Sequence, residues 1–334
     1  MTDADTWPGG RTVLVALGGN AMSAPDGTAT EPDQIAALTA AAEHIADLVD
    51  AGHRVAVTHG NGPQVGNLLV KNELAAHVVP PVSLDWCVAQ TQATIGFVLC
   101  DALEAALAAR GREPRVAALV TRTLVDADDP AFDAPSKPIG RYRSADEAAA
   151  MIAHGQHWAD LGERGWRRVV ASPEPREILD AATGRDLLDA GVTIVLGGGG
   201  GVPVVRAVDG RLTGVEAVID KDLSAAVLGP YLGCDTLVIA TDVPHAVVGF
   251  GTPDAEPLRR VSVDRVRHLL DAGEFGAGSM APKMTSAARF AAAPGRTAIV
   301  TTLDGIAAAL AAEHVGGVSI GTIVTLTGLT RRSR

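Results

Sequence analysis

Short apolar runs alternate with long, Ala-rich stretches along this chain of 334 residues. The apolar runs are continuous and end at small or polar residues, which is typical of strands that are buried on both faces. The stretches 32–51 and 86–109 carry the longer pattern of helices. The predicted strands are 12–17, 55–58, 116–120, 193–196, 237–240 and 298–301, and 202–205 reads as another.

Strands separated by helices predict a parallel or mixed sheet that is covered on both faces, with ligands bound beyond the carboxyl ends of the strands. The length is about twice that of a typical domain and allows one large α/β domain or two lobes. Pro and Asp gather between about 122 and 175. We expect an inserted subdomain or lid there, the alternative being a surface excursion with no role.

Loops that carry glycine follow several of these predicted strands, and another precedes residue 280. Glycine lets backbone N–H groups approach a ligand closely, so such loops suit phosphate or carboxylate groups, although any single one could be an ordinary turn. Neither a Walker A loop nor a G-x-G-x-x-G loop that leads into a helix is present, which disfavours a dinucleotide site. We expect His59, beside the second loop, to be neutral and bonded to backbone. The loop residues are Gly18, Gly19 and Asn20, then Gly60, Asn61 and Gly62, then 197–201, then Gly276 and Gly278.

The net charge of −11 argues against binding to nucleic acid or to an anionic membrane surface. The apolar run near the N-terminus is too short for a signal peptide, and longer apolar stretches are interrupted by charge, so we expect a cytoplasmic protein with no membrane span. Cys87, Cys100 and Cys234 stand singly among apolar neighbours. That spacing predicts buried thiols in a reducing compartment and no disulfide framework or zinc site.

Lysine is scarce, because 24 of the 28 basic residues are arginine. A lysine that survives such a bias can mark a position that needs a compact ammonium group. Lys137 lies in a plausible loop of the expected lid, Lys221 in VIDKD with Asp222 beside it, and Lys283 in GSMAPKM. Lys71 falls on a predicted helix face as a solvated bystander. Ammonium groups, backbone cradles and one carboxylate fit phosphoryl transfer, which needs in-line positioning and charge neutralisation. Asp222 could orient the lysines or help to hold Mg²⁺.

Eight segments spread over residues 15–284 resemble, in order, those of the carbamate kinases in the amino acid kinase superfamily. The resemblance implies a three-layer αβα sandwich with an eight-stranded, mainly parallel open sheet and a protruding subdomain. It also implies a homodimer, and a single domain with an N-terminal lobe (11–215), an inserted subdomain (about 122–175) and a C-terminal lobe (216–334). The segments are VALGGNA, THGNGPQVG, SKPIG, VVASPEP, LGGGGGVPVV, GVEAVIDKD, ATDV and GSMAPKM.

The resemblance implies reversible phosphoryl transfer between ATP and carbamate, often run toward ATP from carbamoyl phosphate, with Mg²⁺ held mostly by the nucleotide phosphates. Lys221 and Lys283 would stabilise the transferred phosphoryl group from two sides, Asp222 would organise them, and Lys137 would reach in from the protruding subdomain. The Gly18 and Gly60 loops, closed by Gly198, Gly199 and Gly200, would surround the carbamate and phosphoryl groups. The nucleotide would lie by Thr241, Asp242, Val243, Phe250 and the turn from Ser279 and Met280 to Lys283.

Two positions bear on the resemblance. Superfamily kinases for other substrates resemble one another in a first-strand lysine where this chain has Ala16, so Lys137 is expected to substitute for it. Carbamate kinases usually carry glycine at Ala281, and the extra methyl group could tighten that turn. A kinase for another small acid or phosphonate and a non-catalytic sensor are the alternatives, and the retained lysines argue against the sensor. Arginine fermentation and purine or allantoin breakdown are both compatible pathways.

Overall fold

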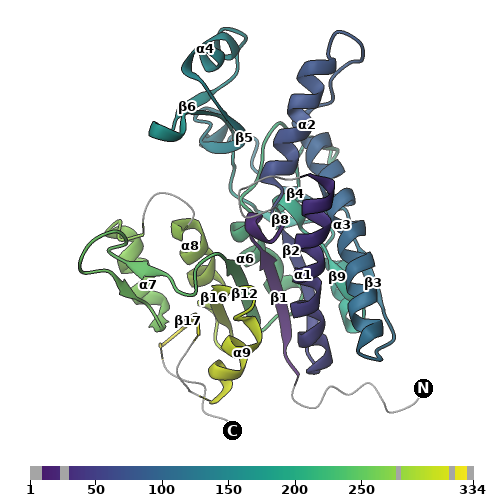
Figure 1. Cartoon of the computed structure of the whole chain (residues 1–334), viewed down its shortest axis with the longest axis vertical. Helices are drawn as coiled ribbons and strands as arrows, with labels where there is room; N and C mark the ends of the chain where they lie inside the picture. Colours follow the sequence, from purple (N-terminus) through teal and green to yellow (C-terminus); the bar gives the residue numbers. More distant parts are fainter. Residues whose placement is uncertain (1–9, 23–29, 276–279, 316–319, 329–334) are drawn as a thin grey trace.

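The computed structural model describes residues 10–22, 30–275, 280–315 and 320–328 (Figure 1). Its largest sheet has eight strands in the order β15-β17-β16-β12-β1-β2-β9-β3. Among these described strands the pairings are parallel, apart from the antiparallel pair of β16 and β17. The expected mainly parallel sheet is therefore confirmed. Its strands are β1 (Thr12–Leu17), β2 (Arg54–His59), β3 (Val116–Ala118), β9 (Thr193–Val195), β12 (Thr236–Thr241), β15 (Arg260–Ser262), β16 (Thr297–Thr302) and β17 (Thr322–Thr325).

The central position of strand β1 in the sheet explains why its sequence is continuously apolar. Each of its six residues is buried, because the strand lies in the interior of the sheet between β2 and β12. Val13 and Val15 point into one hydrophobic cluster, whereas Leu14 and Ala16 point into the other. Alternate side chains thus serve opposite faces, as the strand period requires.

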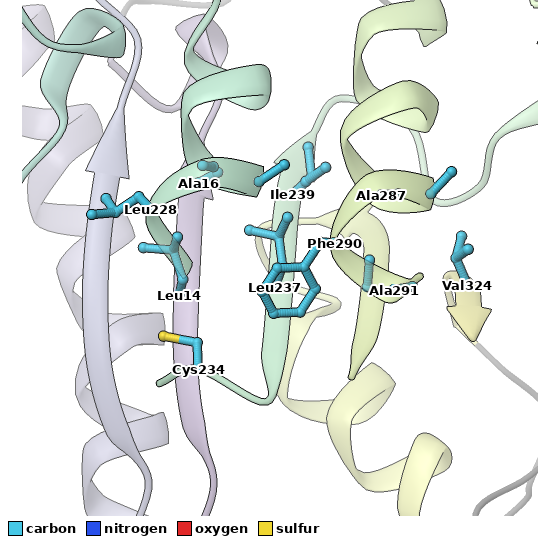
Figure 2. Packing of buried hydrophobic residues seen from close by; sticks show 14 of the residues in the cluster. Leu14, Ala16, Leu228, Cys234, Leu237, Ile239, Ala287, Phe290, Ala291 and Val324 are labelled. Carbon is cyan, nitrogen blue, oxygen red and sulfur yellow. The ribbon is translucent and has the colours of Figure 1, made fainter. Parts of the chain in front are cut away.

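Helices cover both faces of the sheet and complete an αβα sandwich (Figure 1). One cluster lies between the sheet and α1 (Glu31–Asp50), α3 (Leu84–Ala109) and α9 (Ile306–Val315). The other lies beneath α5 (Ala181–Asp189), α6 (Lys221–Tyr231), α7 (Val263–Asp271) and α8 (Met280–Ala291). Figure 2 shows Leu14, Leu237 and Phe290 of this second cluster lying between the sheet and helices α6 and α8.

Helix α3 is the one helix in the described ranges that is long and apolar enough to cross a membrane by length and composition. Its inner face carries Ile95, Leu99 and Leu103, which are buried against the sheet. This packing accounts for the apolar inner face as that of a core helix. The outer face of α3 exposes Trp86 and Phe97.

The segment 137–170 projects from the body of the molecule, and we name it the projecting subdomain (Figure 1). It contains β5 (Lys137–Arg143), α4 (Ala145–Ala153), β6 (Trp158–Asp160) and β7 (Trp166–Val170), and its sheet has the order β5-β7-β6. By contrast β4 (Arg122–Leu124) belongs to the four-stranded sheet β11-β10-β4-β8. The other members of that sheet are β8 (Glu177–Ile178), β10 (Val202–Arg206) and β11 (Leu212–Gly214).

Helix α2 (Gly62–Ala75) packs against strand β5 and so joins the projecting subdomain to the rest of the molecule. A Cβ at Gly66 of this helix would lie 2.5 Å from the backbone N of Gly140 in β5, so no larger residue fits there without movement. Glu73, on the same helix, accepts from Arg168 at 3.1 Å and from Gln156 at 3.1 Å. The remaining described elements are β13 (Val247–Val248), β14 (Glu256–Pro257) and the short helices η1 (Gly19–Met22), η2 (Pro130–Phe132), η3 (Gly162–Arg164) and η4 (Gly198–Gly200).

The three cysteines are free thiols, as their spacing predicts. Cys87 and Cys234 are buried, and Cys100 is half-buried. Burial raises the pKa of Cys234 to about 12, with the charge of Asp235 acting in the same direction. A thiol held protonated in this way is inert at neutral pH.

Candidate active site

The loops after β1 and β2 converge where α6 begins. A Cβ at Gly18 would lie 2.9 Å from the carbonyl oxygen of Ala240, so the first loop runs close beside the end of β12. A Cβ at Gly60 would lie 3.5 Å from Cδ of Lys221. The second loop therefore lies against the aliphatic part of the Lys221 side chain. The backbone N–H groups of the loop and the ammonium group of Lys221 are thus in the same part of the site.

The third glycine loop, 197–201, packs behind the second. Gly199 has φ +63°, and a Cβ there would lie 2.9 Å from Oδ1 of Asn61 and closer still to its other amide atoms. The hydroxyl of Thr58 donates to the Gly197 carbonyl at 2.8 Å, and that of Ser224 donates to the Gly200 carbonyl at 2.7 Å. Glycine is required here by backbone conformation and by space, and the loop ties β2 to α6.

Two lysines share one buried carboxylate at the centre of the site. Lys283 Nζ in α8 lies 3.2 Å from Oδ2 of Asp222, and Lys221 donates to Oδ1 of the same side chain. Asp222 is only 3% exposed, and Ser286 donates to its carbonyl oxygen. Burial lowers the pKa of Lys221, and the charge of Asp222 opposes that change. Asp222 thus holds two ammonium groups in fixed positions.

Lys137 reaches the same helix from the projecting subdomain. Its Nζ lies 2.5 Å from Oδ2 of Asp220, the residue immediately before Lys221. Burial would raise the pKa of Asp220, but the charge and hydrogen bond of Lys137, with Lys221 adding to them, lower it to about 2. Lys137 is the first residue of strand β5, which corrects the expectation that it lies in a loop. Three lysines therefore surround the start of α6.

His59 is a neutral structural residue, as predicted. Its Nδ1 lies 2.7 Å from the Gly60 carbonyl oxygen, and the side chain is 1% exposed. Burial lowers the pKa of His59 to about 4; the Gly60 bond opposes the shift and the charge of Lys221 adds to it. The neutral ring donates to Gly60 and fixes the turn of the second loop. Lys71 is exposed on α2, consistent with a bystander.

The residues expected around the nucleotide lie at the end of β12 and just after it, after β13, and at the start of α8. The hydroxyl of Thr241 donates to Asp242 at 3.1 Å, Val243 follows, and Phe250 is 77% exposed. Residues 280–283 form the first turn of α8, so the expected turn there is wrong. Ala281 is part of this helix, and alanine is the residue that favours a helix most. Ser279 and the side chain of Asn20 lie outside the described residues.

The donor set does not form a metal cage. Both carboxylate oxygens of Asp222 accept from ammonium groups, which leaves the residue poorly suited to bind Mg²⁺ directly. Within the described ranges, no group of three or more His, Cys, Asp or Glu side chains is placed to hold a metal ion. The suggestion that Asp222 helps to hold Mg²⁺ is therefore not supported by its partners.

Several residues that build the site were not singled out in the sequence. Asp220 caps α6, Ser224 and Ser286 fix the surrounding backbone, and Gln64 donates to the Met22 carbonyl at 3.2 Å. Asp220 carried a usable signal, since Asp directly before a helix is a strong N-cap residue. The other three carry no signal in their local sequence.

Comparison with known proteins places these features in a family. The model of the family described as "Amino acid kinase family" matches residues 11–302. Carbamate kinase from Pyrococcus furiosus is 40% identical over 300 residues, which covers 88% of this chain and 95% of the relative. Carbamate kinase 1 from Enterococcus faecium is 40% identical over 311 residues, covering 92% of this chain and 99% of the relative.

A solved structure gives the same result for the fold. The structure of carbamate kinase from Giardia lamblia bound to AMP-PNP aligns with a TM-score of 0.86 at 36% identity. The alignment covers 95% of this chain and 99% of the Giardia chain. On sequence and structure together, the chain belongs to the amino acid kinase family and, within it, to the carbamate kinases.

Proposed function

We propose that this enzyme transfers a phosphoryl group reversibly between ATP and carbamate, giving ADP and carbamoyl phosphate. The observation that carries the proposal is the buried pair of Lys221 and Lys283 on Asp222, beside the Gly60 loop, in a chain of the carbamate kinase family. Phosphoryl transfer asks little covalent chemistry of a protein and depends on positioning and electrostatic stabilisation. The site supplies both.

The charges of the site are balanced for an anionic group. Three ammonium groups and the two carboxylates Asp220 and Asp222 leave one net positive charge. A unit charge at 4 Å contributes about 4 kcal/mol at an effective dielectric near 20, so each lysine can stabilise the transferred group substantially. Lys221 and Lys283 would contact that group from two sides, and Lys137 would cover it from the projecting subdomain.

Backbone donors would complete the phosphoryl and carbamate site. The glycines at its edge leave room for a ligand beside Lys221, since Gly19 and Gly62 have open space where a Cβ would be. Gly198, Gly199 and Gly200 support this cradle from behind. The first strand has Ala16, fully buried in a hydrophobic cluster, at the position of the lysine of other superfamily kinases. Lys137 would supply the ammonium group in place of that lysine.

ATP and ADP are the co-substrates of this kinase. We place the nucleotide beside the end of β12, the segment after β13 and the start of α8. The residues are Thr241, Asp242, Val243, Phe250 and Met280. Mg²⁺ would arrive with the nucleotide and be held by its phosphates, because Asp222 is already engaged by two lysines. The metal would add positive charge to the transferred group.

We also propose a cytoplasmic homodimer. Trp86 and Phe97 expose apolar surface on α3, and Val120 does so beyond β3, the edge strand on which α3 packs. An exposed apolar patch at a sheet edge is a common subunit interface. Sedimentation should give twice the chain mass, and Trp86→Glu should give monomers. Val208→Glu, at an exposed site on the β10–β11 hairpin, should leave the dimer intact.

Substrate choice is tested by comparing acyl phosphates. The purified protein is mixed with MgADP and either carbamoyl phosphate or acetyl phosphate at equal concentrations, and ATP is measured over time. We expect ATP from carbamoyl phosphate at a rate at least tenfold above that from acetyl phosphate. Faster ATP formation from acetyl phosphate would show that the enzyme serves another small acid.

A further inference from the structure

We propose that Asp220 is a positioning residue that holds Lys137 over the phosphoryl site. The two side chains come from different parts of the molecule, Lys137 from the base of the projecting subdomain and Asp220 from the N-terminus of α6. Their charged atoms lie 2.5 Å apart although the residues are 83 positions apart in sequence. This contact links the subdomain to the helix that carries Lys221 and Asp222.

The two oxygens of Asp220 have separate partners. Oδ1 accepts from the backbone N–H groups of Asp222 at 2.9 Å and Leu223 at 3.3 Å, which caps α6 and fixes the carboxylate to the helix. Oδ2 is left to accept from Lys137. Because the cap holds the carboxylate in place, the position of Lys137 is set relative to the rest of the site.

The pairing leaves Lys137 able to bind substrate. An ammonium group has three N–H donors, and one of them serves Asp220. The other two can reach an anionic oxygen while the ion pair is kept. The low pKa of Asp220, about 2, keeps the carboxylate ionised throughout the neutral range. Asp220 thus orders a long, flexible side chain before the substrate arrives, which reduces the entropy lost on binding.

The substitution that separates this role from helix capping is Asp220→Asn. Asparagine caps a helix as well as aspartate does, and its side chain has the same size, but it carries no charge for Lys137. The cap is therefore kept in Asp220→Asn, so any fall in its thermal midpoint reports the lost ion pair with Lys137 and not a lost cap. A purely capping role predicts unchanged turnover in the same variant.

The proposal rests on the proposed function of Lys137, and a double-mutant cycle tests it. The turnover number and the KM for MgADP are measured for wild type, Asp220→Asn, Lys137→Ala and the double variant. We expect Asp220→Asn to lower kcat about tenfold or more with little change in KM, and to cause no further loss when Lys137 is already alanine. Equal losses in both backgrounds would overturn the proposal.

A second measurement does not depend on turnover. The intact protein is treated with limiting acetic anhydride, and acetylation of each lysine is followed by mass spectrometry, with exposed Lys71 as the internal reference. Lys137 should react several-fold faster, relative to Lys71, in Asp220→Asn than in the wild type. An unchanged ratio would overturn the proposal. Faster acetylation together with a fully active Lys137→Ala variant would keep the contact and reject the role of Lys137 in catalysis.

Discussion

Replacing Gly66 by alanine should displace the projecting subdomain relative to helix α2 and lower the activity of the site, although Gly66 is not itself part of the site. A Cβ at this position would lie 2.5 Å from the backbone N of Gly140, in the same strand as Lys137. Non-bonded carbon and nitrogen atoms need about 3.5 Å, so the helix and strand must separate by about 1 Å. Lys137 would move with its strand.

The two effects of this substitution act in opposite directions on stability. Alanine in place of glycine inside a helix stabilises by about 1 kcal/mol, whereas overpacking costs about 1 to 3 kcal/mol. The free energy of unfolding should therefore fall by no more than about 2 kcal/mol. A displacement of about 1 Å at a catalytic group costs roughly 10²-fold in rate, so kcat should fall far more than stability does.

The assay compares Gly66→Ala with Asn67→Ala, the next position on the same helix, where alanine meets no such backbone. Urea denaturation gives the free energy of unfolding, and ATP formation from carbamoyl phosphate gives kcat for each variant. Asn67→Ala should keep wild-type turnover. A folded Gly66→Ala enzyme with kcat within about twofold of the wild type would refute the idea that this contact sets the position of Lys137.

Three further substitutions probe the charges of the site. Asp222→Ala leaves Lys221 and Lys283 buried without their shared partner, and should lower the free energy of unfolding by about 3 to 5 kcal/mol in urea denaturation. His59 resists protonation when folded, so stability should decline as pH falls from 6.5 to about 4, by at most roughly 3 kcal/mol; a pH series on His59→Asn should lack this decline. Lys137→Arg should lower kcat, because a guanidinium is larger and fixed in shape; an active arginine variant would show that any cation suffices.

The strands were predictable because the sheet is buried on both faces. Six apolar runs correspond to β1, β2, β3, β9, β12 and β16 within one or two residues at each end. Strands β15 and β17 were not predicted. β15 is three residues long and starts with arginine, and β17 has only two apolar residues between two threonines, so neither stands out as an apolar run.

The site was predictable where residue type alone carries the signal. Scarcity singled out Lys137, Lys221 and Lys283, and the structure brings all three to the start of α6. The Lys137–Asp220 contact could not be predicted, because it joins residues far apart in sequence, one in strand β5 and the other at the start of α6. Residues 280–283 of the turn expected up to Lys283 form the first turn of α8 instead. Pro282 does not prevent this, since proline is tolerated in the first turn of a helix, where its missing N–H has no partner to lose.

The central claim is that carbamoyl phosphate passes its phosphoryl group directly to ADP between Lys221 and Lys283. Its most direct test is the initial rate of ATP formation from MgADP and carbamoyl phosphate by the wild type and by Lys221→Ala and Lys283→Ala, each checked for folding by circular dichroism. The wild type should form ATP, and each variant should be about 10²- to 10³-fold slower, as when one preorganised charge-stabilising donor is lost. No ATP from the folded wild type, or near-normal rates in both variants, would contradict the account.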